Sequence, residues 1–276
     1  LYLMIWNWQQ PDWTDFRFDK SRLDSQEAWF MHSAGVVLGM IKHLDAGATD
    51  QLRIELLSDE AVQTSAIEGE ILDRESVQSS LRRQFGLETD DRRVTPAEQG
   101  VAEMMVDLYR TFDQPLEHAT LQRWHQMLMK GRSDVRNIGR YRTHEEAMQV
   151  VSGRLDRITV YFEAPPSAIV PKEMDRFNRW FNQTAPGGDA ALPAITRAGV
   201  AHLYFVTIHP FEDGNGRVGR AVAEKALAQT LGRPTLLALA DAIKRRQKDY
   251  YRALQEASLT NEITPWLTWF ADTAVQ

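Results

Sequence analysis

A twelve-residue stretch, HPFEDGNGRVGR at 209–220, constrains the fold more than any other part of this sequence. Its glycines let the backbone turn and approach a ligand closely, and its arginines supply fixed positive charge. Apolar residues at helical spacing lie on both sides, at 194–208 and after Gly216. The pattern predicts helix, loop, helix, with Gly-Asn-Gly-Arg at the start of the second helix, where free N–H groups can bind an anion.

The charged side chains of this stretch suggest chemistry on phosphates. Arg217 and Arg220 are three residues apart, so they project from one helix face. Asp213 precedes the glycines and could hold a magnesium ion that bridges phosphates. His209, at the end of the first helix, could accept a proton from an attacking hydroxyl. We therefore expect a site where the phosphates of a nucleotide meet a proton-transfer group.

Two other nucleotide-binding patterns compete with this interpretation. Residues 214–219 also match GxGxxG, and Asp241 follows after about 20 residues, as in a dinucleotide-binding fold. That fold needs a strand running into the first glycine inside a βαβ unit, and alternating strands are missing here. A P-loop is excluded because GxxxxGK[ST] occurs nowhere in the sequence.

Histidine pairs elsewhere give weaker signals. His202 lies seven residues before His209, and His118 lies seven before His125, so each pair could share a helix face. Neither pair has a third ligand at the spacing of a zinc site, so we expect no zinc. His202 is expected to be a hydrogen-bonded core residue.

The rest of the chain is also predicted to be mainly helical. Apolar periodicity and capping signals predict helices at 26–44, 49–68, 73–83, 96–112, 119–130, 171–181, 239–257 and 265–274. In the first, a set of apolar residues recurs at helical spacing: Trp29, Phe30, Val36, Val37, Met40, Ile41 and Leu44. The aromatic-rich residues 1–24 should dock their rings on the helical body.

One β-hairpin is predicted, at about 148–162, where β-branched runs flank a Ser-Gly turn. A lone hairpin has unpaired edges, and such an edge can bind an extended peptide by strand addition. The hairpin could equally pack on its neighbours, and the residues alone leave both possibilities open.

Composition excludes several classes of protein. The sequence has no cysteine, so disulfides, thiolate metal sites and cysteine nucleophiles are absent. The net charge is −6, and no long basic run favours nucleic acid or a membrane surface. No apolar run approaches the roughly 20 residues that span a bilayer. A cytoplasmic protein is therefore the expectation.

Glu68 occupies an unusual position before Gly69, in the last turn of the helix predicted at 49–68. A carboxylate there opposes the helix dipole unless a cation lies nearby. A solvated surface glutamate would lose little at this place, so the residue alone is a weak signal.

The stretch at 209–220 resembles the signature of the Fic family, HPFx(D/E)GNGRxxR, and matches it at every fixed position. TSAIEG at 64–69 resembles the family's inhibitory motif, (S/T)xxxE(G/N), and GRYR at 139–142 and YYRAL at 250–254 are similar to further segments of Fic proteins. The resemblance implies a mainly α fold, a Fic-type helical bundle with a small β-hairpin flap, plus an N-terminal helical extension. The extension would cover 1–90 and the catalytic core 91–276.

The resemblance also implies an activity: transfer of AMP from ATP to a Ser, Thr or Tyr hydroxyl of a protein, with Mg²⁺ and release of pyrophosphate. His209 would be the general base and Asp213 the magnesium ligand. Arg220 would bind the terminal phosphate, and the other phosphate-binding residues would be Gly214, Asn215, Gly216, Arg217, Val218 and Gly219. Doc-type kinases have Lys at the position of Gly216, so this residue favours AMP transfer over phosphoryl transfer.

Regulation and partners follow from the same resemblance. Thr64 and Glu68 would be inhibitory, with Glu68 paired to Arg220 so that ATP binds unproductively. The target protein would bind at the flap hairpin, and the enzyme could also modify itself. Tyr251 would line the adenine pocket, although Ser258 stands where the family often has Asn, which weakens the expected adenine contacts.

Two alternatives concern function. Glu68 could instead orient a water that removes AMP from a modified protein, or the chain could be a non-catalytic nucleotide-sensing module. Many related chains continue into a winged-helix domain, whereas this sequence stops at Gln276. Nucleic acid is therefore expected as a partner only through such a further domain, and no membrane partner is expected.

Overall fold

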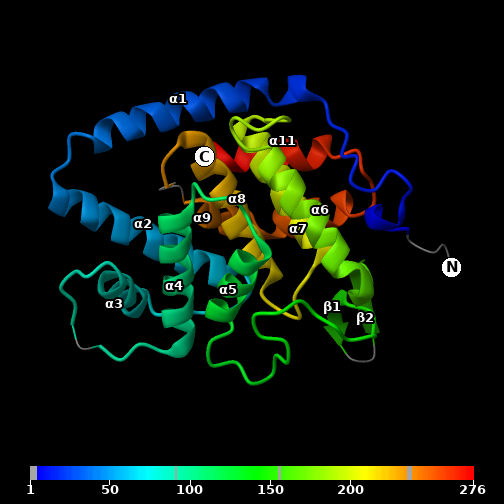
Figure 1. Ribbon diagram of the computed structural model, residues 1–276, viewed down its shortest axis with the longest axis horizontal. Coiled ribbons are helices and arrows are strands. Elements are labelled where there is room, and N and C mark those ends of the chain that lie inside the picture. Colours follow the sequence, from blue (N-terminus) through cyan, green and yellow to red (C-terminus); the bar gives the residue numbers. More distant parts are fainter. Residues whose placement is uncertain (1–4, 91, 155–156, 235–237) are drawn as a thin grey trace.

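The computed structural model describes residues 5–90, 92–154, 157–234 and 238–276. These residues form a mainly helical protein with one two-stranded sheet, as predicted (Figure 1). The α-helices are α1 (Asp24–Ile41), α2 (Ala46–Ile67), α3 (Arg74–Gln84), α4 (Pro96–Thr111), α5 (His118–Leu128), α6 (Val170–Gln183), α7 (Ala194–Ile208), α8 (Asn215–Leu231), α9 (Leu239–Arg245), α10 (Gln247–Ala257) and α11 (Thr264–Ala274). Short 3-10 helices lie at Asn7–Gln9, Lys20–Arg22 and Ser167–Ile169, and the strands are β1 (Gln149–Arg154) and β2 (Arg157–Glu163). None of the described helices is long and apolar enough to cross a membrane.

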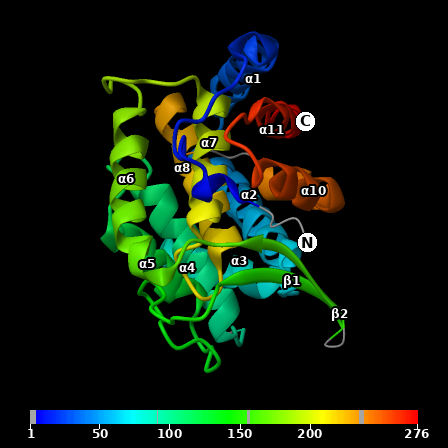
Figure 2. The same ribbon diagram turned by 90° about the vertical axis from the view of Figure 1, so that its right-hand side faces the viewer.

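Helices α7 and α8 form the centre of the molecule, and the other helices surround them (Figures 1 and 2). Nearly every residue of α7 and most of α8 are buried, which is typical of helices that are apolar all round. The two helices pack closely because Gly219 has no side chain: a Cβ there would lie 2.9 Å from Val206 Cγ1. The predicted helix, loop and helix around residues 209–214 are confirmed.

Helix α2 connects the N-terminal part of the chain to this centre. It contacts α3, α4, α8 and α9, and it buries Ile54 and Ala61 completely. Asp45 caps its first turn by accepting a hydrogen bond from Ala48 N at 2.8 Å. The helix ends next to the loop between α7 and α8, so its last residues lie at the candidate site.

The helix predicted at 26–44 is present as α1, but most of its apolar residues are exposed. Helix α1 runs along the upper edge of the molecule in Figure 1 and contacts mainly α7 and α11. Phe30 and Ala34 are its buried residues. Because a helix covered on one side buries only one narrow stripe, several large residues remain 42–67% exposed: Trp29, Val36, Val37, Met40 and the following Leu44.

The single helix predicted at 239–257 is wrong, because the structure has two helices there. Arg246, with φ −115° and ψ 28°, interrupts the helical backbone between α9 and α10. Its guanidinium donates to Thr273 Oγ1 at 2.9 Å and lies 5.3 Å from the Trp269 ring centroid. Packing on α11 therefore redirects the chain, a tertiary effect that helical periodicity does not record.

The hairpin and the aromatic N-terminal segment pack together. Strands β1 and β2 are antiparallel, with Gln149 opposite Glu163 and an irregularity between Val150 and Val151. Figure 2 shows the hairpin projecting from the helical body. The Trp6 ring lies 5.4 Å from the Phe162 ring, edge to face. The hairpin is thus confirmed, but the predicted Ser-Gly turn is wrong, because Ser152 and Gly153 pair with Thr159 and Ile158 within the strands. The predicted docking of N-terminal rings on the helical body is confirmed by Trp13, whose ring lies 5.4 Å from that of Tyr204 in α7.

Gly100 lets helices α4 and α5 approach closely. A Cβ at this position would lie 1.9 Å from Met127 O, so an alanine cannot fit without separating the helices. Gly100→Ala is expected to lower the free energy of unfolding by about 2 kcal/mol, although alanine is the better helix former. Gly39→Ala in α1 is the matched control, because nothing lies within 4 Å of its Cβ position, and it should raise the free energy slightly. Urea denaturation followed by circular dichroism measures both; equal stability of the two variants would contradict the close approach.

Candidate active site

The loop between α7 and α8 contains two residues with left-handed backbone conformation. Gly214 has φ 78°, which glycine adopts at no steric expense. His209 has φ 51° and ψ 57°, a region that is unfavourable for a residue with a Cβ. Asn215 braces the loop, because its side chain accepts from Phe211 N at 2.9 Å and donates to Phe211 O at 2.8 Å. The side chain of Asn215 is therefore used for loop structure, and its N–H belongs to the first turn of α8.

His209 is neutral at pH 7 in this structure. Burial lowers the pKa of His209 from 6.5 to about 4, and the positive charge of Arg142 adds to this effect. Nδ1 lies 3.2 Å from Val206 O, a contact that favours a hydrogen on Nδ1. Nε2 then carries the lone pair, so the imidazole can act as a base.

Arg220 is 1% exposed and is bound by residues at the end of α2. Its Nη2 lies 2.7 Å from Glu68 Oε1, and its Nε donates to Thr64 Oγ1 at 2.7 Å. A Cβ at Gly216 would lie 2.1 Å from Glu68 Oε1, so this carboxylate lies against the first turn of α8. The Glu68 carboxylate therefore occupies the helix N-terminus where an anion would bind.

Arg217 is also paired with a carboxylate, and the sequence reasoning missed this partner. Arg217 Nη1 lies 2.6 Å from Glu70 Oε2. Gly69, with φ 83°, forms the turn after α2 that lets Glu68 and Glu70 reach neighbouring arginines. The sequence does contain a signal for the pair of Arg217 and Glu70. Two glutamates flank Gly69, and two arginines lie three residues apart in the other motif.

Asp213 lies beside the start of α8, with its side chain 43% exposed. One carboxylate oxygen accepts from Gly214 N at 2.6 Å, and the other lies 2.9 Å from Arg132 Nη1. The described residues contain no group of three or more His, Asp or Glu side chains that could hold a metal. A single half-exposed carboxylate nevertheless fits Mg²⁺, which usually takes most of its ligands from phosphates and water.

Of the two remaining predicted positions, Tyr251 lies within α10 and Ser258 directly follows this helix. Tyr251 is 43% exposed, and its hydroxyl donates to Ile67 O at 3.0 Å, directly beside Glu68. Ser258 is buried, and its hydroxyl donates to Gln255 O within the same helix segment. The structure thus brings Tyr251 to the end of α2, whereas the Ser258 hydroxyl is used locally.

The other histidines have structural roles. His202 is fully buried, and its Nε2 lies 2.8 Å from the Tyr250 hydroxyl, which confirms the predicted core histidine. His125 stacks on Phe211 with ring centroids 4.1 Å apart, and its Nδ1 accepts from Gly139 N. His125 therefore packs against the loop through Phe211.

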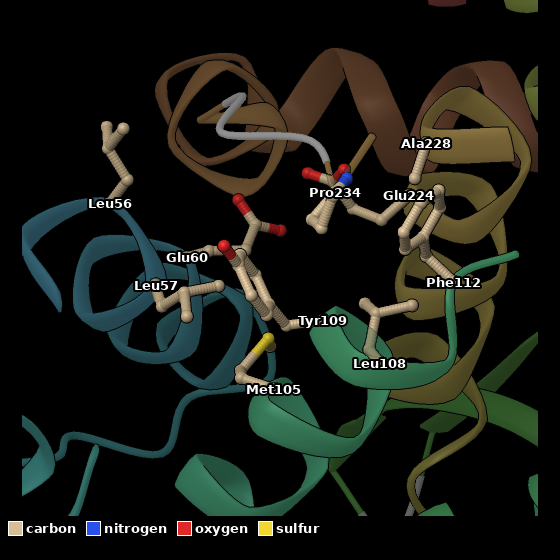
Figure 3. Close-up of a pocket in the computed structure, with 10 residues that line it drawn as sticks. All are labelled: Leu56, Leu57, Glu60, Met105, Leu108, Tyr109, Phe112, Glu224, Ala228 and Pro234. Carbon is tan, nitrogen blue, oxygen red and sulfur yellow. The ribbon is translucent and has the colours of Figure 1, made fainter. Parts of the chain in front are cut away.

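A small cavity lies next to the site, between α2, α4 and α8 (Figure 3). Its volume is about 20 Å³, enough for one water molecule. Glu60 and Glu224 lie at its edge, and burial together with the charge of Glu224 raises the pKa of Glu60. The cavity is too small for a substrate, so the arginines and His209 remain the candidate site.

Comparison with known proteins agrees with this geometry. Residues 115–227 match the Fic/DOC family, and residues 6–87 match a domain of unknown function, DUF4172. A protein adenylyltransferase Fic from Drosophila melanogaster is 32% identical over 99 residues, which cover 36% of this chain and 18% of that protein. The corresponding protein from Nematostella vectensis is 29% identical over 129 residues, covering 46% of this chain and 28% of that protein. The chain thus spans less than a third of the length of these curated relatives.

Solved Fic structures share the fold. A Fic family protein from Desulfovibrio desulfuricans G20 superposes with a TM-score of 0.63 at 24% identity, covering 91% of this chain and 73% of that chain. Fic-1 from C. elegans gives a TM-score of 0.62 at 20% identity, covering 93% of this chain and 72% of that chain. Residues 115–227 of this chain therefore match the Fic/DOC family, and the chain as a whole shares the fold of solved Fic proteins.

Proposed function

We propose that this protein is a self-inhibited adenylyltransferase that transfers AMP from ATP to a hydroxyl of a target protein. The observation that carries the proposal is a neutral imidazole at His209 in the same short loop as an anion-binding helix N-terminus with two buried arginines. The adenylyltransferase names of its relatives point to the same reaction.

In the proposed reaction, His209 Nε2 takes the proton from the target hydroxyl as its oxygen attacks the α-phosphorus of ATP. The new P–O bond forms, the bond to the oxygen that bridges the α- and β-phosphorus breaks, and pyrophosphate leaves with that electron pair. Arg217 and the N–H groups of α8 stabilise charge on the phosphates, and Arg220 binds the γ-phosphate. Mg²⁺ held by Asp213 would neutralise part of the phosphate charge.

The hairpin is the proposed binding site for the target protein. Its two strands pair only with each other among the described residues, so both outer edges can accept an extended segment. The Phe162 ring centroid lies 6.5 Å from that of His209, so β2 ends close to the base. Tyr251, beside the end of α2, would contact the adenine.

Self-inhibition rests on the two glutamates. Glu68 pairs with Arg220 at the N-terminus of α8, and Glu70 pairs with Arg217. The phosphates of ATP must therefore displace both carboxylates to bind productively. Thr64 contributes by holding Arg220 through its hydroxyl and its carbonyl.

The reaction class can be tested with ATP labelled at different phosphates. With Glu68→Gly protein, label from the α-phosphate should enter protein and label from the γ-phosphate should not. Transfer of the γ-label would indicate phosphoryl transfer, and nucleotide binding without covalent product would indicate a sensing module. Release of AMP from an AMP-modified protein by the unaltered chain, dependent on Glu68, would favour removal of AMP.

Glu70→Ala is expected to activate AMP transfer by about fivefold, less than changes at Glu68. The Glu70 side chain is 32% exposed, and such an ion pair contributes about 1 kcal/mol, while Glu68 would still hold Arg220. Initial rates of α-label incorporation measure the effect, with Glu88→Ala in the exposed loop after α3 as control. Equal rates for the two variants would show that Glu70 does not restrain the site.

A further inference from the structure

Arg142 is a buried cation whose partners are backbone and hydroxyl oxygens. It is 2% exposed, and its side chain donates to backbone carbonyls and the Ser167 hydroxyl, with no ion pair to a carboxylate among the described residues. Its Nε donates to His209 O at 2.8 Å, and its Nη2 donates to Ile208 O at 3.3 Å. Its backbone N–H donates to Pro210 O at 2.9 Å. Three successive carbonyls around the proposed base are thus bound by one residue.

Burying a guanidinium without a carboxylate is unfavourable unless other groups stabilise its charge. The C-terminal carbonyls of α7 carry partial negative charge, and Arg142 lies directly against them. Burial lowers the pKa of Arg142 to about 10, so it remains charged at pH 7. The buried charge of Arg142 is therefore stabilised by one particular arrangement of the backbone carbonyls at the end of α7.

That arrangement includes the left-handed conformation of His209. A non-glycine residue with φ 51° persists only where its surroundings hold it. Its own N–H is fixed by Phe205 O at 3.0 Å, and its carbonyl is fixed by Arg142. The imidazole direction depends on this backbone conformation, so Arg142 determines where Nε2 lies.

The other end of the guanidinium reaches the root of the hairpin. Nη2 also donates to Pro165 O, and Nη1 donates to Ser167 Oγ at 2.8 Å. These residues directly follow β2, which ends at Glu163. One rigid, planar group thus connects the loop that carries His209 to the strand proposed to bind the target.

We propose that Arg142 is a positioning residue that fixes the His209 imidazole relative to a target hydroxyl held at the hairpin. This rests on the proposed AMP transfer. A misplacement of about 1 Å between reacting groups can lower a rate a hundredfold, so loss of Arg142 should reduce turnover far more than nucleotide binding.

The test compares Arg142→Met and Arg142→Lys in the Glu68→Gly protein. Arg142→Met should lower kcat for AMP incorporation by about a hundredfold, with KM for ATP changed less than about threefold. Arg142→Lys keeps the charge but loses the planar fork, so it should recover only part of the rate. Ser167→Ala, which removes one hairpin contact and leaves the core intact, should lower kcat by a few-fold.

Arg197→Met is the matched control, because Arg197 is also fully buried and binds backbone carbonyls, Phe181 O and Ala226 O, away from the loop. It should lower Tm as Arg142→Met does but leave kcat unchanged. Equal kcat in both arginine variants, or a loss that follows Tm in both, would overturn the proposal.

A second readout does not require activity. The charged groups that influence His209 are Arg142, Glu68 and Asp213. Removal of the Arg142 charge should raise the pKa of His209, measured by NMR titration, whereas Arg197→Met should leave it unchanged. If the Glu68→Gly parent transferred no AMP, the proposed function would fail, while an unchanged His209 titration in Arg142→Met would by itself overturn the positioning role.

Discussion

Replacing Glu68 with glycine should raise AMP incorporation into protein by at least tenfold. The carboxylate accepts a 2.7 Å hydrogen bond from a buried guanidinium, and hydrogen bonds to charged groups contribute about 1.5–3 kcal/mol. Removing the Glu68 carboxylate leaves Arg220 available for the γ-phosphate and leaves the N-terminus of α8 available for an anion. Arg220 would still be held in place by Thr64, so the site should remain formed.

The measurement is the initial rate of α-label transfer from ATP to added protein and to the enzyme itself. Glu88→Gly makes the same chemical change in an exposed loop and should leave the rate at the starting level. Glu68→Gln keeps the size of the side chain but loses the charge, so it should give an intermediate rate. A Glu68→Gly rate equal to that of Glu88→Gly would remove the inhibitory role.

Replacing His209 with alanine in the Glu68→Gly protein should abolish AMP transfer. General base catalysis contributes about 10²–10⁴-fold, and no other histidine lies in the loop. ATP affinity should change by less than about threefold, because the proposed phosphate contacts come from α8 and its arginines. The expected signature is therefore loss of kcat with retained binding.

Calorimetric titration with ATP and label transfer measure the two quantities separately. His32→Ala on the exposed face of α1 is the control and should affect neither. Transfer that persists at a tenth or more of the parent rate in His209→Ala would refute the assignment of His209 as the base. Loss of binding together with transfer would instead indicate that His209 is needed to keep the loop folded.

Predictions from local patterns were reliable where local physics decides the outcome. The helix boundaries at 194–208 and the turn at Gly214 follow from apolar periodicity and from the φ values that glycine tolerates. The hairpin followed from its β-branched residues, although the predicted Ser-Gly turn lies inside the paired strands. Predictions failed where packing decided: helical periodicity predicted one helix at 239–257, whereas Arg246, which contacts Thr273 in α11, interrupts it.

The sequence by itself determined the helix–loop–helix and placed His209 and the two arginines together, because these lie within twelve consecutive residues and depend on local backbone geometry. The contact between Glu68 and Arg220, which are 152 residues apart, was expected from the resemblance to the Fic inhibitory motif and not from residue order. Only the tertiary structure showed that Glu70 meets Arg217, 147 residues away, and that Arg142 binds the carbonyls around His209. Such contacts form only when distant segments pack together, and charge pairs gain strength only once burial removes water, so periodicity and spacing do not record them.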